Sequence, residues 1–270
     1  MGKKQSLGDR IKSSYEDRSK TFLNRRTITI IRLDGKGFSK FTKGLNKPFD
    51  DGFSQDMDTT ALYLCENIQG AKFAYTQSDE ISVVLCDFDN IETDAWFDYN
   101  VQKMTSIAAS LASARFNQLR MARYAFYSGL EPKWMEESYM SVSEIQNFNL
   151  AFFDARVFQV PNVDEMFNAI LWRQQDCTRN SISMAASAQY SHKELEKKSS
   201  SVKQEMLFQK GINWNDYKPK YKRGSVVKKK LYYIEGPDGD TYARSKWIVD
   251  ANTPIFTEDR EYLYNLIPIV

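Results

Sequence analysis

The hydrophobic positions of this chain change period several times, and each change predicts a different element. Residues 27–33 (TITIIRL) are β-branched and mostly apolar, which is typical of a buried strand. Residues 50–68 place apolar side chains at helical intervals behind an acidic start, which favours a helix N-terminus. Two further strand-like runs, AKFAYT and ISVVLCDF, are separated only by the short QSDE, so the pattern predicts an antiparallel hairpin.

A second long helix is expected over residues 97–121, where apolar and small side chains repeat on one face. The strand FFDARVFQVP follows and ends at Pro161. The resulting order is β-α-β-β-α-β, which predicts a ferredoxin-like arrangement of four antiparallel strands covered on one face by two helices. We therefore expect an α/β fold of the α+β type, with this core in residues 1–160.

The C-terminal part, residues 161–270, predicts a helical and β-hairpin extension. NVDEMFNAILWRQQD begins with an asparagine cap and has helical spacing, and the segment from Thr178 to about Lys210 also has a helical pattern. The last predicted element is a hairpin whose turn is marked by Gly236, Pro237, Asp238 and Gly239. Because no linker separates the two parts, we expect the extension to pack on the core as one structural unit.

Composition describes a globular chain with little net charge. It has 270 residues, 42% of them hydrophobic, and a formal net charge of +2, so any nucleic-acid surface must be local. The basic segment, residues 203–230, is such a surface or a solvated face. Its basic residues are Lys203, Lys210, Lys218, Lys220, Lys222, Arg223, Lys228, Lys229 and Lys230, and they alternate with Trp214, Tyr217 and Tyr221. Cations with aromatic rings suit phosphates and stacked bases.

The cysteines and the hydropathy pattern bear on the compartment. Cys65, Cys86 and Cys177 form neither an even framework nor a metal-ligand spacing, so buried thiols in a reducing compartment are expected, with the cytoplasm as the default. No apolar run reaches membrane-spanning length, so we expect no membrane partner. Lone His192 lies in a polar helix-like stretch and is expected to be an exposed helix residue.

Candidate chemistry centres on three acids. Asp34 ends the first strand, and Asp79 and Glu80 lie at the bend of the hairpin. Side chains alternate along a strand, so at most one of Asp79 and Glu80 faces a given surface, and Asp34 is expected to face Asp79. Two close carboxylates share a proton or hold a divalent cation, and the Gly35 carbonyl adds an oxygen ligand that suits Mg²⁺. A turn aspartate and an exposed bend explain the same residues without any site.

Basic and hydroxyl side chains around these acids favour the metal interpretation. They are Arg32, Lys47, Ser78, Lys103 and Arg156. Arginine and lysine bind phosphate oxygens while a metal neutralises the same group from the other side. Together these residues predict nucleotidyl transfer by a two-metal scheme, in which one ion activates the attacking hydroxyl and the other stabilises the leaving phosphate.

Five ordered motifs carry a family resemblance: RLDGKGFSKF, NKPFD, TQSDEISVVL, DARVFQVP and WRQQDCTRNSISMAA. With these, the chain resembles the tRNA-histidine guanylyltransferase family of 3′-to-5′ polymerases from about Thr27 through the basic segment. The resemblance implies a polymerase-like palm, which agrees with the predicted strand order. It also implies tRNA and nucleoside triphosphates (ATP and GTP or another NTP) as substrates, and a homo-oligomer, commonly a tetramer.

The same resemblance implies roles for individual residues. Asp34, Asp79 and the Gly35 carbonyl would hold two Mg²⁺ ions, and Glu80 would support catalysis. The implied nucleotide or phosphate contacts are Arg32, Lys36, Gly37, Phe38, Lys47, Asp50, Ser78, Lys103, Arg156, Asn180, Lys203 and Asn213. The implied tRNA contacts are Arg179, Lys210, Lys222 and Arg223.

One motif departs from the enzymes that add the extra guanosine to tRNA-histidine. Where those read His-Ile-Asn-Asn, this chain has Thr178, Arg179, Asn180 and Ser181. This departure resembles the guanylyltransferase-like branch, which implies template-directed repair of 5′-truncated tRNA, with the 5′ end activated by ATP or already a triphosphate. Thr178 is also a candidate helix cap. The alternatives are a histidine-specific guanylyltransferase, a palm-type nucleotide cyclase and a non-catalytic RNA-binding module.

Overall fold

The computed structural model describes residues 5–127, 149–235 and 239–268, and its centre is one antiparallel sheet. Six strands lie in the order β4-β1-β3-β2-β5-β6, and every neighbouring pair is antiparallel. Their bounds are β1 Ile28–Gly35, β2 Ala71–Gln77, β3 Glu80–Leu85, β4 Phe153–Val160, β5 Ser225–Glu235 and β6 Thr241–Asp250. The first four strands have the predicted ferredoxin-like order, and the expected fold class is confirmed.

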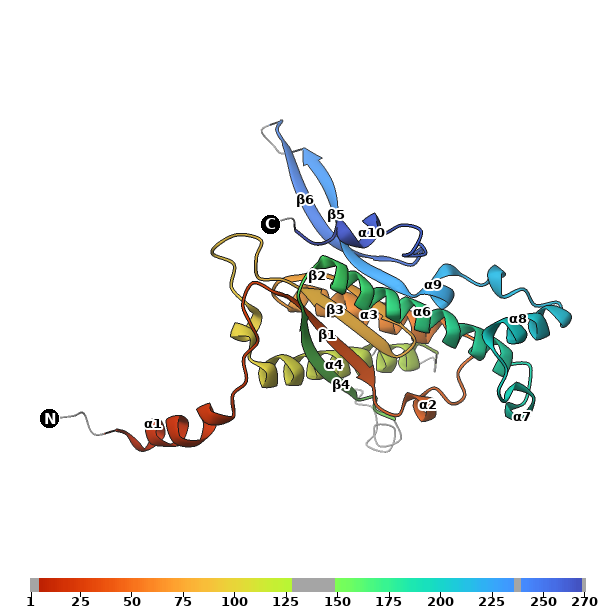
Figure 1. Ribbon diagram of the computed structural model, residues 1–270, viewed down its shortest axis with the longest axis horizontal. Coiled ribbons are helices and arrows are strands. Elements are labelled where there is room, and N and C mark those ends of the chain that lie inside the picture. Colours follow the sequence, from red (N-terminus) through yellow and green to blue (C-terminus); the bar gives the residue numbers. More distant parts are fainter. Residues whose placement is uncertain (1–4, 128–148, 236–238, 269–270) are drawn as a thin grey trace.

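Two long helices cover one face of this sheet, as predicted. They are α3, Asp51–Asn67, and α4, Val101–Tyr127, which contact each other along the sheet (Figure 1). Ile31 and Leu33 of β1 are fully buried against these helices, which contribute Met57 and Phe116 to the same core. Burial of side chains of this size stabilises the fold by roughly 1.5–3 kcal/mol each.

The opposite face is covered by a third long helix, α6, Val163–Ser187. Asn162 caps it by accepting a hydrogen bond from the Glu165 N–H at 2.9 Å, as the sequence predicts. Ile28 and Ile30 pack on this face against Met166 and Phe167 of α6. Alternate residues of β1 therefore enter two separate cores, so residues 32 and 34 lie on the α6 face.

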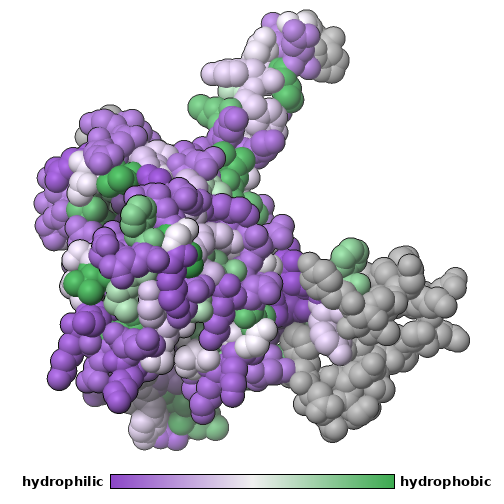
Figure 2. All heavy atoms as spheres, turned by 90° about the vertical axis from the view of Figure 1, so that its right-hand side faces the viewer, coloured by the Kyte–Doolittle hydropathy of each residue, from purple (hydrophilic) through white to green (hydrophobic). Residues whose placement is uncertain are grey.

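The C-terminal extension continues the same sheet. Strand β5 pairs with β2 from Ser225 to Lys228 and then leaves the body with β6 as the predicted hairpin. Figures 1 and 2 show this hairpin projecting from the molecule, with hydrophilic and hydrophobic residues mixed along it. Gly236, Pro237 and Asp238 of its predicted turn lie outside the described residues.

Short helical segments connect these elements. They are α1 Leu7–Ile11, a π turn Lys12–Glu16, a 3-10 turn Asp17–Ser19, α2 Phe38–Phe41, a 3-10 turn Trp96–Tyr99, α7 His192–Leu195, α8 Ser200–Gln209, a 3-10 turn Trp214–Asp216, α9 Pro219–Arg223 and α10 Glu261–Tyr264. His192 is exposed at the start of α7, as expected.

Two helix boundaries differ from the prediction. The helix expected from residue 97 begins at Val101, because Phe97 and Asp98 have φ values of 52° and 51° and interrupt the helical backbone. Thr178 does not cap a helix, since α6 runs through it without a break to Ser187. Its hydroxyl instead donates a hydrogen bond to the Lys222 carbonyl at 3.0 Å, which ties α6 to α9.

The three cysteines are unpaired and buried, as expected. Burial raises the pKa of the Cys177 and Cys86 thiols to about 12, so neither is a thiolate at neutral pH. None of the helices in the described part of the chain combines the length and the apolar character needed to span a bilayer.

Candidate active site

The three predicted acids meet where β1 ends beside the hairpin of β2 and β3. The Gly35 N–H donates a hydrogen bond to the Asp79 carbonyl at 3.1 Å, which holds the bend against the end of β1. Glu80, and not Asp79, is the ladder partner of Asp34. From the sequence we expected Asp34 to face Asp79, which is one residue away from the observed partner. The reason is that β3 begins at Glu80, whereas Asp79 belongs to the turn together with Ser78, whose φ is 50°.

Glu80 is fixed by a buried ion pair to α6. The Arg173 Nε donates to the Glu80 Oε1 at 2.6 Å, and the Arg173 Nη2 donates to Asp176 at 2.7 Å. The Arg173 guanidinium also lies over the Trp172 ring, 4.3 Å from its centroid. Glu80 therefore lies on the α6 face with Asp34. We missed Arg173, although WRQQD contains its partner three residues on.

The surroundings of Asp79 and Glu80 at the bend disfavour the charged form of both carboxyl groups. Burial raises the pKa of Asp79, and the nearby Asp34 charge raises it further, while the Ser78 hydroxyl lowers it. Burial also raises the pKa of Glu80, against the opposite effect of Arg173. A bound cation would remove the penalty on these carboxylates.

The donor set for such a cation is small. Within residues 5–127, 149–235 and 239–268, no group of three or more His, Cys, Asp or Glu side chains is arranged to hold a metal ion. The available ligands are Asp34, Asp79 and the Gly35 carbonyl, all hard oxygens. No side chain fits at Gly35 itself, since a Cβ there would lie 2.4 Å from the Phe38 ring on the core side of β1. A small number of protein oxygen ligands is enough for Mg²⁺, because this ion keeps several water ligands and takes further oxygen ligands from phosphates.

Two arginines lie beside these acids, as predicted. Arg156 Nη2 is 3.9 Å from Asp34 Oδ2 and 3.4 Å from Asp154 Oδ1. Arg32 is its ladder partner and lies 5.5 Å from the Trp172 ring centroid. The Arg156 side chain is 54% exposed, so its guanidinium remains open to a phosphate. Asp154, opposite Asp34 on β4, is a further acid that we did not predict.

The predicted nucleotide contacts after β1 have mixed outcomes. Lys36 and Lys47 are exposed, and Gly37 has a φ of 69° that allows the turn into α2. Asp50 caps α3, where its carboxylate accepts the Phe53 N–H at 2.7 Å. The Phe38 ring is 3% exposed among other aromatic rings of the core, so the predicted nucleotide contact of Phe38 could involve only its backbone.

Lys103 does not join the acids in this chain. Strand β3 runs away from the bend to Leu85, and α4 begins beyond that far end, where Asn100 bridges to Phe22. The Lys103 ammonium lies 5.8 Å from the Phe97 ring centroid. The expectation that Lys103 surrounds the acids is therefore wrong, because a crossover helix starts at the end of the sheet opposite to the bend.

The predicted contacts on α6 and α8 cluster around polar partners. Asn180 and Arg179 are exposed and donate to Asp176 at 3.3 and 3.0 Å. Lys203 donates to the Ser183 hydroxyl at 3.0 Å, and Lys210 to the Gln189 carbonyl at 2.7 Å. Both lysines are thus tied to α6 or to the segment that follows it.

The remaining predicted contacts lie around α9. Asn213 caps the Trp214 turn by accepting the Asn215 N–H at 3.1 Å. Lys222 is 8% exposed and its ammonium donates to the Asn215 carbonyl, so its burial contradicts the predicted tRNA contact. Burial also lowers the pKa of Lys222. Arg223 is half-buried, and its carbonyl accepts the Tyr75 hydroxyl at 2.8 Å.

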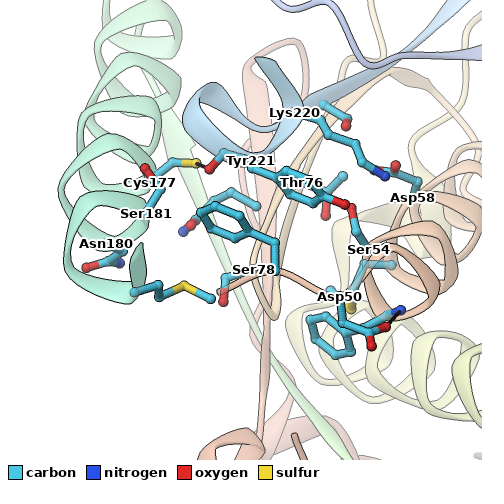
Figure 3. Close-up of a pocket in the computed structure, with 16 residues that line it drawn as sticks. Asp50, Ser54, Asp58, Thr76, Ser78, Cys177, Asn180, Ser181, Lys220 and Tyr221 are labelled. Atoms are coloured by element: carbon cyan, nitrogen blue, oxygen red, sulfur yellow. Dashed lines mark hydrogen bonds between the residues drawn. The ribbon is translucent and has the colours of Figure 1, made fainter. Parts of the chain in front are cut away.

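A small pocket of about 70 Å³ opens beside the bend. We call it the α3–α6 pocket, because α3 and α6 form two of its walls and Ser78, Lys220 and Tyr221 close it (Figure 3). Its wall includes the stacked rings of Phe49 and Tyr221, whose centroids are 4.5 Å apart. Asp58 lies inside, and burial raises its pKa to about 6.

Comparison with known proteins agrees with this geometry. The sequence pattern of the tRNAHis guanylyltransferase family matches residues 8–161, more than half of the chain. The chain belongs to the tRNAHis guanylyltransferase family. This is a family of nucleotidyltransferases that act on tRNA, so the resemblance read from the sequence motifs and the expected enzyme class are confirmed.

The matches to individual relatives span different shares of the two sequences. An uncharacterized protein of Acanthamoeba polyphaga mimivirus is 34% identical over 66% of this chain, and the match spans 61% of that protein. The tRNA(His) guanylyltransferase of Debaryomyces hansenii is 29% identical over 80% of this chain and 79% of its own length.

Solved structures extend the likeness to nearly the whole chain. A bacterial tRNA(His) guanylyltransferase-like protein in complex with ATP is 37% identical, with a TM-score of 0.79 over 97% of this chain and 99% of that one. The complex of such a protein with GTP is 35% identical, with a TM-score of 0.76 over 96% and 98%. The Saccharomyces cerevisiae enzyme, at 23% identity and a TM-score of 0.61, shares the fold.

Proposed function

We propose that this protein adds nucleotides to the 5′ end of tRNA in the 3′-to-5′ direction, as template-directed repair of 5′-truncated tRNA. The observation that carries the proposal is the meeting of Asp34 and Asp79 at the end of β1, with Arg156 3.9 Å from Asp34. Oxygen ligands and guanidinium groups at the ends of neighbouring strands fit a triphosphate or an activated 5′ phosphate.

The donor set fits Mg²⁺, and we propose two ions held by Asp34, Asp79 and the Gly35 carbonyl. When bound, they would supply Lewis-acid activation of the attacking hydroxyl and charge stabilisation of the leaving phosphate. A cation would favour the carboxylate form of Asp79, whose pKa is raised by burial. The Arg173 pair holds Glu80 on the same face and fixes its carboxylate before substrate binds.

The reaction has two displacements at phosphorus. First, an oxygen of the tRNA 5′ phosphate attacks the α-phosphorus of ATP, pyrophosphate leaves, and the tRNA gains a 5′-linked AMP. Second, the 3′-hydroxyl of the incoming nucleotide loses its proton and attacks the 5′ phosphorus, and AMP leaves. A tRNA that already carries a 5′ triphosphate enters at the second step and releases pyrophosphate. In both cases the product keeps the triphosphate of the incoming nucleotide at its new 5′ end.

The protein's own cations would orient these phosphates. Arg32 and Arg156 lie opposite each other on neighbouring strands, and the Arg156 side chain is 54% exposed beside Asp34. Guanidinium groups bind phosphate oxygens in a fork, so this pair can align the attacked phosphorus with the acids. Exposed Lys47 and Ser78 are proposed to complete the nucleotide contacts.

Two observations favour the repair branch over tRNA-histidine specificity. The bacterial guanylyltransferase-like proteins resemble this chain over nearly its whole length, at 37% and 35% identity. The residues Thr178, Arg179, Asn180 and Ser181 also replace His-Ile-Asn-Asn. We further propose that the enzyme acts as a homo-oligomer, a tetramer as in the family, and in the cytoplasm.

The test uses purified protein, Mg²⁺ and a set of tRNAs that lack one 5′ nucleotide and carry a 5′ triphosphate, each offered the four NTPs in turn. The expected result is addition only of the nucleotide complementary to the opposing base of the 3′ side. Addition of guanosine whatever the opposing base would assign the protein to the histidine-specific branch instead. A cyclic nucleotide formed without RNA would assign it to the cyclases, and binding of tRNA without any transfer would leave an RNA-binding module.

A further inference from the structure

One buried polar atom beside the candidate active site has no partner. The Oε1 atom of Gln77 is one of two buried side-chain polar atoms in the described residues without a hydrogen bond. Gln77 is 7% exposed and lines the α3–α6 pocket. An unpaired buried carbonyl oxygen destabilises the free protein, so such an atom inside a pocket points to a ligand that donates to it.

The position of Gln77 connects it to the acids. Gln77 is the ladder partner of Glu80, Glu80 is the partner of Asp34, and Asp34 is the partner of Asp154. These four residues therefore form a row across the neighbouring strands β2, β3, β1 and β4. Strands are separated by about 4.8 Å, so Gln77 is about 10 Å from Asp34 along this row. A nucleotide spans such a distance from its α-phosphate to the edge of its base.

The chemistry of the pocket suits a planar base. Phe53 and Met57 of α3 and Met184 of α6 provide apolar walls, and Phe49 and Tyr221 provide aromatic ones. Ser78 lies in the wall of the pocket and directly precedes Asp79 in the chain, so the pocket adjoins the bend that carries the acids. A ligand with its base inside would therefore carry its phosphates toward Asp34 and Asp79.

An amide side chain distinguishes the two purines. It presents one acceptor and one donor side by side, which match the amino group at position 6 and the ring nitrogen 7 of adenine. Guanine offers two acceptors on the same edge, so the oxygen of the amide would remain unpaired against it. On this edge, the side chain of Gln77 is thus complementary to adenine and not to guanine.

We propose that Gln77 sets the base preference of the activating nucleotide, by binding the adenine of ATP inside the α3–α6 pocket. This inference rests on the proposed function, since it assigns a base site to the first of its two steps. It makes Gln77 a specificity-determining residue.

The test is nucleotide binding by calorimetry with Mg²⁺ and without tRNA. The ligands are ATP, GTP and purine riboside triphosphate, which lacks the amino group at position 6. Wild type is expected to bind ATP about tenfold more tightly than purine riboside triphosphate, the size of one good hydrogen bond to a buried partner. Gln77→Met should remove this preference, so that ATP and the analogue bind with affinities within about twofold of each other. Gln209→Met, at an exposed position on α8, is the matched control and should change neither value.

Thermal stability is a second measurement, and it distinguishes a ligand-binding role of Gln77 from a purely structural role. If the oxygen is unpaired in the free protein, Gln77→Met should raise the Tm by about 2–4 °C, since it removes a buried polar group. If ordered water alone occupies the site, the Tm should fall and the ATP preference should persist, which overturns the proposal. Gln77→Asn, with a shorter arm, gives the same binding test should the methionine variant not fold.

Failure of this inference is distinguishable from failure of the proposed function. Wild type that adds nucleotides to 5′-truncated tRNA but binds ATP and purine riboside triphosphate equally would refute the base site alone. Wild type that shows the ATP preference but adds no nucleotide to any tRNA, including one with a 5′ triphosphate, would refute the function alone.

Discussion

Asp34 and Glu80 are direct partners in the antiparallel ladder of β1 and β3, on the sheet face covered by α6. Their roles differ because their surroundings differ. The Asp34 side chain is 43% exposed near Arg156, whereas the Glu80 side chain is 11% exposed and bonded to Arg173. Asp34 can therefore bind an incoming cation, while Glu80 is already neutralised by the protein. The ion pair of Glu80 thus serves to position the acids.

Arg173→Met should destabilise the protein by about 3 kcal/mol at pH 8, because it leaves a buried carboxylate without its partner. Burial already raises the pKa of Glu80, and loss of Arg173 raises it further. A carboxyl whose folded pKa lies above its unfolded value loses stability as pH rises between the two. The variant's unfolding free energy should therefore fall more steeply with pH than that of wild type, as measured by urea denaturation from pH 4.5 to 8.

The control for this variant is Arg179→Met, which removes an exposed partner of the same Asp176. It should cost less than about 1 kcal/mol, as is usual for surface ion pairs. Equal losses for Arg173→Met and Arg179→Met, with the same pH dependence, would contradict the assigned role of Arg173.

Gly35→Ala should weaken both the fold and the metal site. The added Cβ would lie 2.4 Å from the Phe38 ring, so β1 or the ring must move, at a cost of about 1–3 kcal/mol. Because the Gly35 carbonyl is a proposed ligand, the Mg²⁺ concentration for half-maximal nucleotide addition should rise. Adding Phe38→Leu makes room and should recover part of the stability. Gly8→Ala, with only an ordinary contact at 3.8 Å, should have no effect.

Asp58 should make the protein less stable as pH rises from about 4 to 6. Burial raises its folded pKa to about 6, above the ordinary value of 3.8, so the folded state binds the proton more tightly than the unfolded state. The shift corresponds to about 3 kcal/mol above pH 6. Asp58→Asn should remove this slope and raise the free energy of unfolding at pH 7, measured by chemical denaturation. An unchanged slope in the variant would show that Asp58 is charged without penalty.

Much of the fold could be predicted from the sequence, because the periodicity of each element is strong. The strand TITIIRL and the helix behind Asp50 lie where their patterns place them, and the strand order followed from the element order. The start of α4 could not be predicted, because nothing in the sequence signals that Phe97 and Asp98 take positive φ values. Residues other than glycine rarely adopt such values.

The acids of the candidate site could be predicted from the sequence, whereas most of the residues that contact them could not. Motif spacing located Asp34 and Asp79, but the register that pairs Asp34 with Glu80 depends on where the bend ends. Arg173, Asp154 and Gln77 were missed, since they reach the site only through packing of α6 and pairing of β4 and β2. Lys103 was wrongly included because the direction of α4 was not considered.

The direction of synthesis is the most direct test of the central claim. Wild type is incubated with Mg²⁺, a tRNA that lacks one 5′ nucleotide and carries a 5′ triphosphate, and the complementary NTP labelled at its γ-phosphate, with Asp79→Asn as the inactive control. In 3′-to-5′ addition the incoming triphosphate becomes the new 5′ end, so the label should appear in the tRNA, and a 3′-deoxy NTP should not be added. Release of the label as pyrophosphate, or addition of the 3′-deoxy nucleotide, would contradict the account.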